Sequence, residues 1–145
     1  MQTEPEKLNI LSLAYMGDAV WEQFVRERVI KRIPNANHAD YLHKAGVRYV
    51  NAQSQAMAVK AMIDGGSFSE EDVALIKRAR NHKTATKAKN ADAVTYKWAT
   101  AFETIIGSLY LQGQTERLSQ IMNTAAELIE SNQKKHIQSN MSKQA

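Results

Sequence analysis

Two segments far apart in the sequence each place one acidic residue in an otherwise apolar stretch. Residues 14–20 read Ala-Tyr-Met-Gly-Asp-Ala-Val around Asp18, and residues 102–107 read Phe-Glu-Thr-Ile-Ile-Gly around Glu103. A carboxylate on a core-facing helix needs a partner, because burying an unpaired charge costs several kcal/mol or neutralises the group. If the two helices pack together, Gly17 and Gly107 allow a close approach. The pattern therefore predicts two carboxylates that share one cation.

The available ligand types indicate which cation would fit. The chain has no cysteine, and oxygen ligands favour a hard ion such as Mg²⁺, which keeps several of its waters. Phosphodiester hydrolysis suits such a site, because the ion lowers the pKa of a bound water and stabilises the leaving oxygen. Spacing alone also allows a second interpretation, in which Asp18 and Glu103 form salt bridges or lie on exposed helix faces. Glu22, four residues after Asp18, could support the metal but is expected to be exposed or ion-paired.

Basic residues gather between residues 77 and 91, where the sequence carries six positive charges and no acid. A run of this size indicates contact with a polyanion. The candidate phosphate-binding residues are Lys77, Arg78, Arg80, Lys83, Lys87 and Lys89. The alternative is a solvated surface, in which the cations simply favour the C-terminal end of a helix.

Length and composition predict one domain. The 145 residues are 43% hydrophobic, which is enough for a continuous core, and the formal net charge of +4 says little about partners by itself. No apolar run approaches the ~20 residues of a membrane span, and the polar, acidic start is unlike a secretory leader. We therefore expect a cytoplasmic protein that makes no contact with a membrane.

The pattern of apolar residues predicts an all-α domain of about six helices, because no segment alternates apolar and polar residues for long. The expected helices cover residues 8–32, a stretch from about 37, 52–63, 70–80, 92–112 and a stretch that starts near 115. Pro34 and the Gly65-Gly66 pair end two of them, and Ser69 caps another. The catalytic domain is expected to cover residues 1–130, followed by a polar, frayed tail over 131–145.

Apolar spacing also predicts which faces are buried. In the first helix the expected stripe is Leu11, Ala14, Tyr15, Val25 and Val29, and Asp18 continues it. In the fifth helix the expected buried face is Phe102, Ile105, Ile106, Leu109 and Tyr110. The aromatic residues Tyr15, Trp21, Trp98 and Tyr110 are expected to serve as core or dimer contacts rather than as platforms for stacking bases.

Residues 15–20, Tyr-Met-Gly-Asp-Ala-Val, resemble the signature helix of the ribonuclease III family, and residues 102–111 resemble its second conserved helix. The order and separation of the two segments also match. The resemblance extends from about Leu8 to Leu128, and larger members continue into a double-stranded-RNA-binding domain. Leu42-His43-Lys44, residues 52–56, residues 77–81 and residues 89–92 resemble the short subfamily called Mini-ribonuclease III.

This resemblance implies a helical, dimeric endonuclease domain that cleaves double-stranded RNA, with Mg²⁺ as cofactor and Mn²⁺ able to substitute. It assigns Asp18 and Glu103 as catalytic and metal-binding residues, and it favours RNA contacts for the basic segment. For the subfamily it implies maturation of precursor large-subunit (23S) ribosomal RNA, with a ribosomal protein as a further partner on that substrate.

The chain departs from the larger family members at three positions. Where they carry additional acids, this sequence has Leu11, Ala14 and Thr100. The metal would then depend more on water, RNA phosphate or Thr100, and we expect weak metal affinity without RNA. The missing acids also leave open a catalytically silent module that binds double-stranded RNA, and a helical protein-interaction adaptor is a third possibility.

Overall fold

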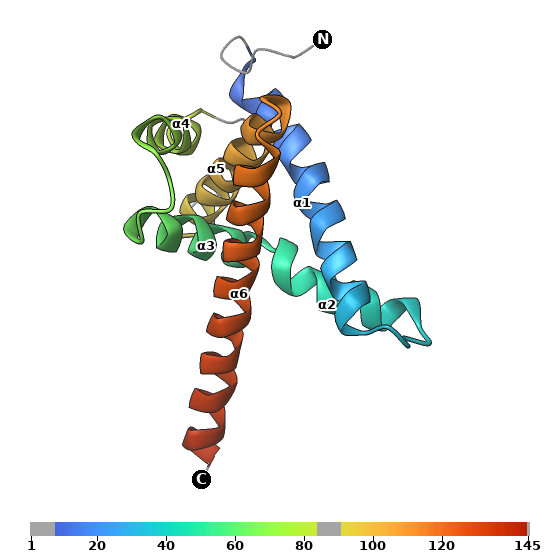
Figure 1. Ribbon diagram of the computed structural model, residues 1–145. Coiled ribbons are helices and arrows are strands. Elements are labelled where there is room, and N and C mark those ends of the chain that lie inside the picture. The colour runs from blue at the N-terminus through green and yellow to red at the C-terminus, as the bar shows by residue number, and fades with distance from the viewer. Residues whose placement is uncertain (1–7, 84–90, 145) are drawn as a thin grey trace.

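The computed structural model describes residues 8–83 and 91–144, and these residues form helices without any strand (Figure 1). The helices are α1 (Ile10–Arg32), α2 (Ala39–Val50), α3 (Ala52–Asp64), α4 (Glu70–Arg80), α5 (Ala91–Leu111) and α6 (Thr115–Gln144). This confirms the all-α prediction, with predicted bounds that differ by two residues or fewer, except that α6 continues through the expected tail. Helix α5 is central, because it packs against α1, α3, α4 and α6.

Local sequence signals explain several helix ends. Asn9 caps α1, since its Oδ1 accepts a hydrogen bond of 2.8 Å from the Ser12 amide. At α4, Ser69 and Asp72 form a reciprocal capping box, in which each side chain accepts from the backbone amide of the other at 3.2 Å. Helix α3 ends before Gly66, whose φ of +75° suits glycine.

The core is centred on the side chains of α1 and α5. Trp21 of α1 is fully buried and meets Phe102 of α5 edge-on, with ring centroids 4.9 Å apart. The indole Nε1 donates a 3.1 Å hydrogen bond to the backbone carbonyl of Tyr49, so the buried polar atom of Trp21 is satisfied. These contacts tie α1, α2 and α5 into one unit.

Two glycines bring the backbones of α1 and α5 into direct contact. A Cβ atom on Gly17 would lie 1.7 Å from the carbonyl oxygen of Glu103, and one on Gly107 would lie 2.0 Å from that of Leu13. Because Leu13 lies opposite Gly107 and Gly17 lies opposite Glu103, the two helices run antiparallel at this crossing. The close approach expected from the sequence is confirmed, and it fixes Asp18 and Glu103 on neighbouring segments.

The buried faces differ in part from those predicted. Leu11 is 72% exposed, Tyr15 is 82% exposed and Tyr110 is 51% exposed, whereas the other predicted stripe residues of α1 and α5 are buried. The reason is that α1 has apolar residues on more than one face, so periodicity cannot tell which face packs on α5. The glycine contact selects the face that contains Gly17 and Trp21. Asp18, which shares the stripe of Leu11 and Tyr15, is therefore exposed.

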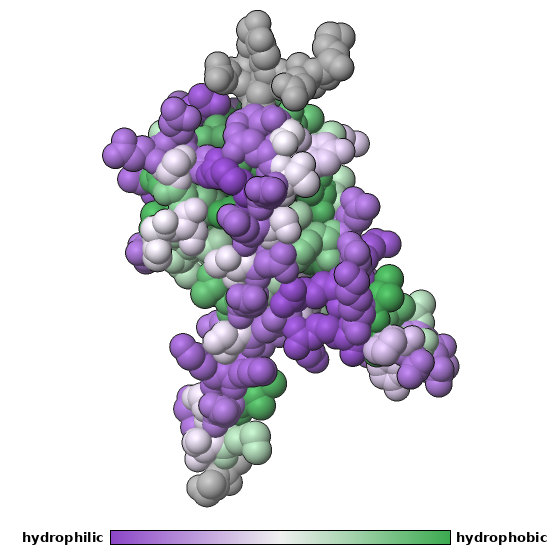
Figure 2. All heavy atoms as spheres, in the orientation of Figure 1, coloured by the Kyte–Doolittle hydropathy of each residue, from purple (hydrophilic) through white to green (hydrophobic). Residues whose placement is uncertain are grey.

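Helix α6 continues beyond the predicted domain boundary. The expected tail from residue 131 is helical to Gln144, and its last turns project past the rest of the described fold (Figure 1). No glycine or proline follows Gly113, so nothing in the sequence forces the helix to end. The surface along α6 is largely hydrophilic (Figure 2), although Ile137 and Met141 are exposed apolar side chains. Among the described helices, none combines the length and apolarity that crossing a membrane would require.

Candidate active site at the crossing of helices α1 and α5

The structure brings together the two acids that the sequence singled out. Asp18 lies on the exposed face of α1, directly after Gly17, and Glu103 is partly buried on α5. Since the backbones touch at Gly17 and Glu103, the two side chains leave the crossing as neighbours. Their carboxyl groups are close enough to share a hydrogen bond. Within residues 8–83 and 91–144 neither acid forms a salt bridge, whereas Asp18 does lie on an exposed helix face, as the second interpretation allowed.

The surroundings of Glu103 favour its neutral form. Burial raises the pKa of Glu103 to about 8, the hydrogen bond with Asp18 and the negative charge of Asp18 act in the same direction, and the charge of Glu22 adds to them. A divalent cation between the two carboxyl groups would remove this repulsion. The chemistry of the donor set therefore fits a hard metal ion, which prefers oxygen ligands.

The remaining protein groups near the pair contribute little as ligands. Ala14 is buried, and Thr100 uses its hydroxyl to donate a 3.0 Å hydrogen bond to the carbonyl of Tyr96. Within residues 8–83 and 91–144, no group of three or more His, Asp or Glu side chains is arranged to hold a metal ion. An ion bound here would thus have two protein carboxylates and would take its other ligands from water or substrate phosphate.

The basic residues lie at the end of α4 and beyond it. Lys77, Arg78 and Lys83 are exposed, as phosphate contacts would require, while Arg80 is half-buried. The Arg80 guanidinium lies 4.8 Å from the ring centre of Trp98, and the Lys60 ammonium lies 5.3 Å from it. Arg80 therefore has one face occupied by a cation–π contact. Lys87 and Lys89 fall outside the described residues.

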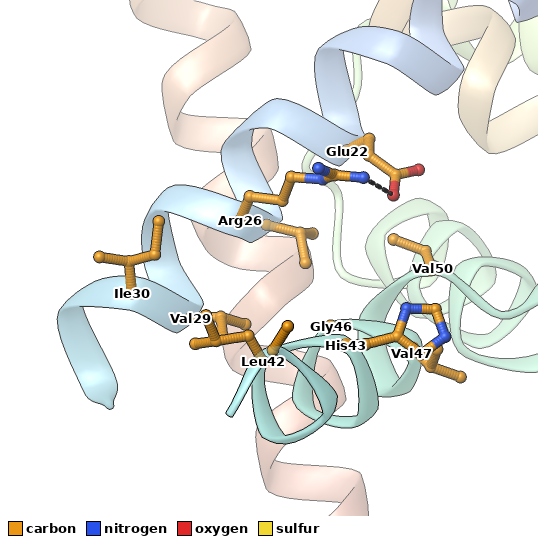
Figure 3. A pocket seen from close by; sticks show the side chains of 11 residues that line it. Glu22, Arg26, Val29, Ile30, Leu42, His43, Gly46, Val47 and Val50 are labelled. Carbon is orange, nitrogen blue, oxygen red and sulfur yellow. Dashed lines mark hydrogen bonds and ion pairs between the residues drawn. The ribbon is translucent and has the colours of Figure 1, made fainter. Parts of the chain in front are cut away.

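Sequence reasoning missed a groove that begins at Glu22, one helical turn beyond Asp18. The groove has a volume of about 320 Å³ and lies between the second half of α1 and helix α2 (Figure 3). Val25, Val29, Leu42 and Val47 give it an apolar lining. At one end Glu22 forms an ion pair with Arg26, as Figure 3 shows. The apolar spacing of α1 predicted burial for Val25 and Val29, but it gave no signal that a groove would remain between the two helices.

Comparison with known proteins identifies the family. Residues 11–114 match the family described as Ribonuclease III domain. The Mini-ribonuclease 3 of Staphylococcus aureus is 41% identical over 116 residues, which cover 80% of this chain and 85% of the relative. The Mini-ribonuclease 3 of Symbiobacterium thermophilum is also 41% identical, over 89% of this chain and 96% of the relative. A crystal structure of a Fusobacterium nucleatum protein superposes with a TM-score of 0.70 at 32% identity, over 83% of this chain and 93% of that one. The chain therefore belongs to the ribonuclease III family of endoribonucleases.

Proposed function

We propose that the chain hydrolyses double-stranded RNA with the help of Mg²⁺, or of Mn²⁺ in its place, and that Asp18 and Glu103 hold the ion. The observation that carries this proposal is the Asp18–Glu103 pair, two neighbouring acids whose mutual repulsion a divalent cation would relieve. When bound, such an ion supplies positive charge that activates water and stabilises a leaving oxygen. The relatives named Mini-ribonuclease 3 support the same reaction.

The protein residues contribute position and charge to this reaction. The glycine crossing fixes the backbones that carry the two carboxyl groups side by side, which reduces the ordering needed when substrate arrives. Glu103 would have to be ionised to hold a cation, and burial, followed by its contact with Asp18 and the charge of Asp18, raises its pKa and so opposes ionisation until a cation is bound. RNA phosphate adds ligands that the protein does not supply, which explains why we expect weak metal affinity without RNA.

A cleavage assay on an RNA duplex tests the assignment of the two acids. Asp18→Asn and Glu103→Gln should each reduce Mg²⁺-dependent cleavage by about a hundredfold or more, while duplex binding in Ca²⁺ and thermal unfolding stay close to wild type. Glu27→Gln is the matched control, because Glu27 is an exposed acid of α1 that pairs with Lys31. Cleavage retained by either acid variant would contradict the assignment. Duplex binding without cleavage by the wild type would favour the silent RNA-binding module instead.

The basic segment provides the proposed duplex contacts. Double-stranded RNA is recognised mostly through its shape and backbone, and exposed lysine and arginine side chains suit this mode. Reversing the charge of Lys83 and Lys87 together should weaken duplex binding and lower the slope of log affinity against log salt by about 2, one for each phosphate contact. Reversing Lys44, which is exposed and pairs with Asp40 on α2, is the control. An unchanged salt slope would refute the proposed role of these lysines.

A homodimer is part of the proposal. Leu11 and Tyr15 are large apolar side chains left exposed in the single chain, on the same face of α1 as Asp18. A second copy that covers them would place the two acid pairs in one assembly. Sedimentation velocity should give a dimer for the wild type and a monomer for Tyr15→Glu, whereas a monomeric wild type would contradict the proposal.

The proposed substrate is precursor 23S ribosomal RNA, presented with a bound ribosomal protein in the cytoplasm. This assignment rests on the resemblance to the Mini-ribonuclease III subfamily. Incubating purified protein with precursor 23S RNA, with and without ribosomal proteins, should yield discrete mature ends. An unrelated duplex of equal length is the control, and equal cleavage of both would argue against a dedicated ribosomal substrate.

A further inference from the structure

A third carboxylate lies one helical turn beyond Asp18. Glu22 lies four residues after Asp18, so the two side chains share one side of α1, and the Glu22 side chain is 42% exposed. Larger family members carry extra acids where this chain has Ala14 and Thr100, and neither of these residues offers a carboxylate. Glu22 is therefore the additional acid that this chain places beside the Asp18–Glu103 pair.

Glu22 does not complete a direct three-acid ligand set among the described residues. This position suits a carboxylate that contacts the water shell of an ion, because Mg²⁺ keeps several waters that need hydrogen-bond acceptors.

The present partner of Glu22 holds it only weakly. Arg26 lies one turn further along α1, and its Nη2 is 3.4 Å from the Glu22 Oε1. The side chains of Arg26 and Glu22 are 75% and 42% exposed, so solvent screens their attraction. Figure 3 shows the pair at the end of the groove between α1 and α2, where open space adjoins both side chains. Glu22 can leave Arg26 without disturbing the core.

We propose that Glu22 is a positioning residue for the catalytic ion. Its carboxylate accepts hydrogen bonds from the waters bound to the ion, and Arg26 competes with these waters for the carboxylate. The inference rests on the proposed function, because it assumes an ion at Asp18 and Glu103. It also gives this chain a substitute for the acids missing at Ala14 and Thr100.

Direct metal binding tests the inference without RNA or turnover. Binding of Mn²⁺ to the purified protein can be followed by the electron paramagnetic resonance signal of the free ion. Glu22→Gln should weaken Mn²⁺ binding by about tenfold, the low end of the loss expected for an outer partner of a metal site. Arg26→Gln should strengthen binding severalfold, because it frees Glu22.

The neighbouring pair Glu27–Lys31 provides matched controls. These residues have the same four-residue spacing on the same helix, their side chains are 73% (Lys31) and 66% (Glu27) exposed, and their charged atoms are 3.2 Å apart. Glu27→Gln and Lys31→Gln change the net charge as Glu22→Gln and Arg26→Gln do, and they should leave Mn²⁺ affinity near the wild-type value. A loss in Glu27→Gln equal to that in Glu22→Gln would reduce the effect to general electrostatics and overturn the inference.

Asp18→Asn separates the two proposals. If Asp18→Asn loses Mn²⁺ binding while Glu22→Gln binds like the wild type, the proposed function stands and the role of Glu22 is refuted. If Asp18→Asn binds Mn²⁺ like the wild type, the metal site itself is wrong and both proposals fall. In the cleavage assay, Glu22→Gln should need about tenfold more Mg²⁺ for half-maximal rate, and it should approach the wild-type rate at saturating Mg²⁺.

Discussion

Two glutamates in this molecule occupy opposite environments. Glu103, at the crossing of α1 and α5, is partly buried beside Asp18, and burial, followed by the contact with Asp18 and the charges of Asp18 and Glu22, raises its pKa to about 8. Glu130, on α6, accepts hydrogen bonds of 2.7 and 2.9 Å from Arg28, and it also pairs with Arg32. The hydrogen bonds from Arg28 are the main reason that the pKa of Glu130 falls to about 2.

The two sets of neighbours indicate different roles: the charge of Glu130 holds helices together, whereas the charge of Glu103 is available for a ligand. The cations around Glu130 come from the chain itself and connect α1 to α6, and the Tyr49 hydroxyl adds a 2.6 Å hydrogen bond from α2. Around Glu103 the described residues whose charges affect it are Asp18 and Glu22, both acidic, which favours a site kept for an external cation. Glu130 therefore stabilises the fold, whereas Glu103 lowers the stability of the fold and forms part of the proposed binding site.

The largest expected effect comes from breaking the crossing that holds Glu103 against Asp18. Gly17→Ala places a Cβ atom 1.7 Å from the Glu103 carbonyl oxygen, and two helix backbones cannot move apart cheaply. We expect a loss of about 3 kcal/mol or more in the free energy of unfolding, above the usual range for overpacking. Chemical denaturation measures this loss.

Gly46→Ala is the control for that substitution. A Cβ atom on Gly46 meets only the Val25 side chain, at 3.9 Å, so alanine in the middle of α2 should stabilise the protein by about 0.5–1 kcal/mol. If Gly17→Ala and Gly46→Ala unfolded alike, the glycine contact would not be what sets the position of the acid pair.

Removing the charge of Glu130 should have the next largest effect. Glu130→Gln leaves Arg28 and Arg32 without their anionic partner, and we expect the free energy of unfolding to fall by about 2–3 kcal/mol at neutral pH. Because the folded pKa of about 2 lies below the ordinary 4.5, the stabilisation is present above pH 4.5 and is lost as pH falls toward 2. The difference from wild type should therefore shrink over that range. Glu127→Gln, an exposed acid on the same helix, should be neutral.

Much of the fold could be predicted from the sequence, because its signals are local. Capping at Ser69, the stop at Gly66 and the apolar spacing of α5 each act within a few residues, and the predicted helices follow them. The meeting of Asp18 and Glu103 could also be predicted, since Gly17 and Gly107 indicate where two helices can touch. The sequence could not predict which face of α1 is exposed, because Leu11 and Tyr15 are as apolar as the residues of α1 that are buried.

The Glu130 cluster shows what sequence reasoning could not reach. Its members lie on α1, α2 and α6, so no spacing rule joins Arg28 and Tyr49 to Glu130. The same holds for the link between Asp72 and Arg117, which joins the start of α4 to α6. Such contacts depend on how helix ends meet in space, and only the packed structure defines that.

The charge of Glu103 should produce a smaller effect with the opposite pH dependence. Its folded pKa of about 8 lies above the ordinary 4.5, so the folded state binds more protons between these values and stability falls as pH rises from 4.5 to 8. Without metal, Glu103→Gln should melt close to wild type at pH 5 and roughly 2–4 °C higher at pH 9. Calorimetry across this range measures the shift. If the melting temperature of Glu103→Gln changed with pH as that of the wild type does, the ionisation of Glu103 would not be the cause of the loss of stability.

The smallest effect should come from trimming one partner of Glu130. Tyr49→Phe removes the hydroxyl that donates to the Glu130 carboxylate but leaves Arg28 and Arg32 in place. We expect a loss of about 0.5–1 kcal/mol in the free energy of unfolding, because the carboxylate keeps its charged donors Arg28 and Arg32 and loses one donor that is neutral. The pKa of Glu130, followed by NMR, should rise slightly and stay well below 4.5. A rise to 4.5 or above would mean that the arginines do not hold this carboxylate, and the contrast with Glu103 would then rest on burial alone.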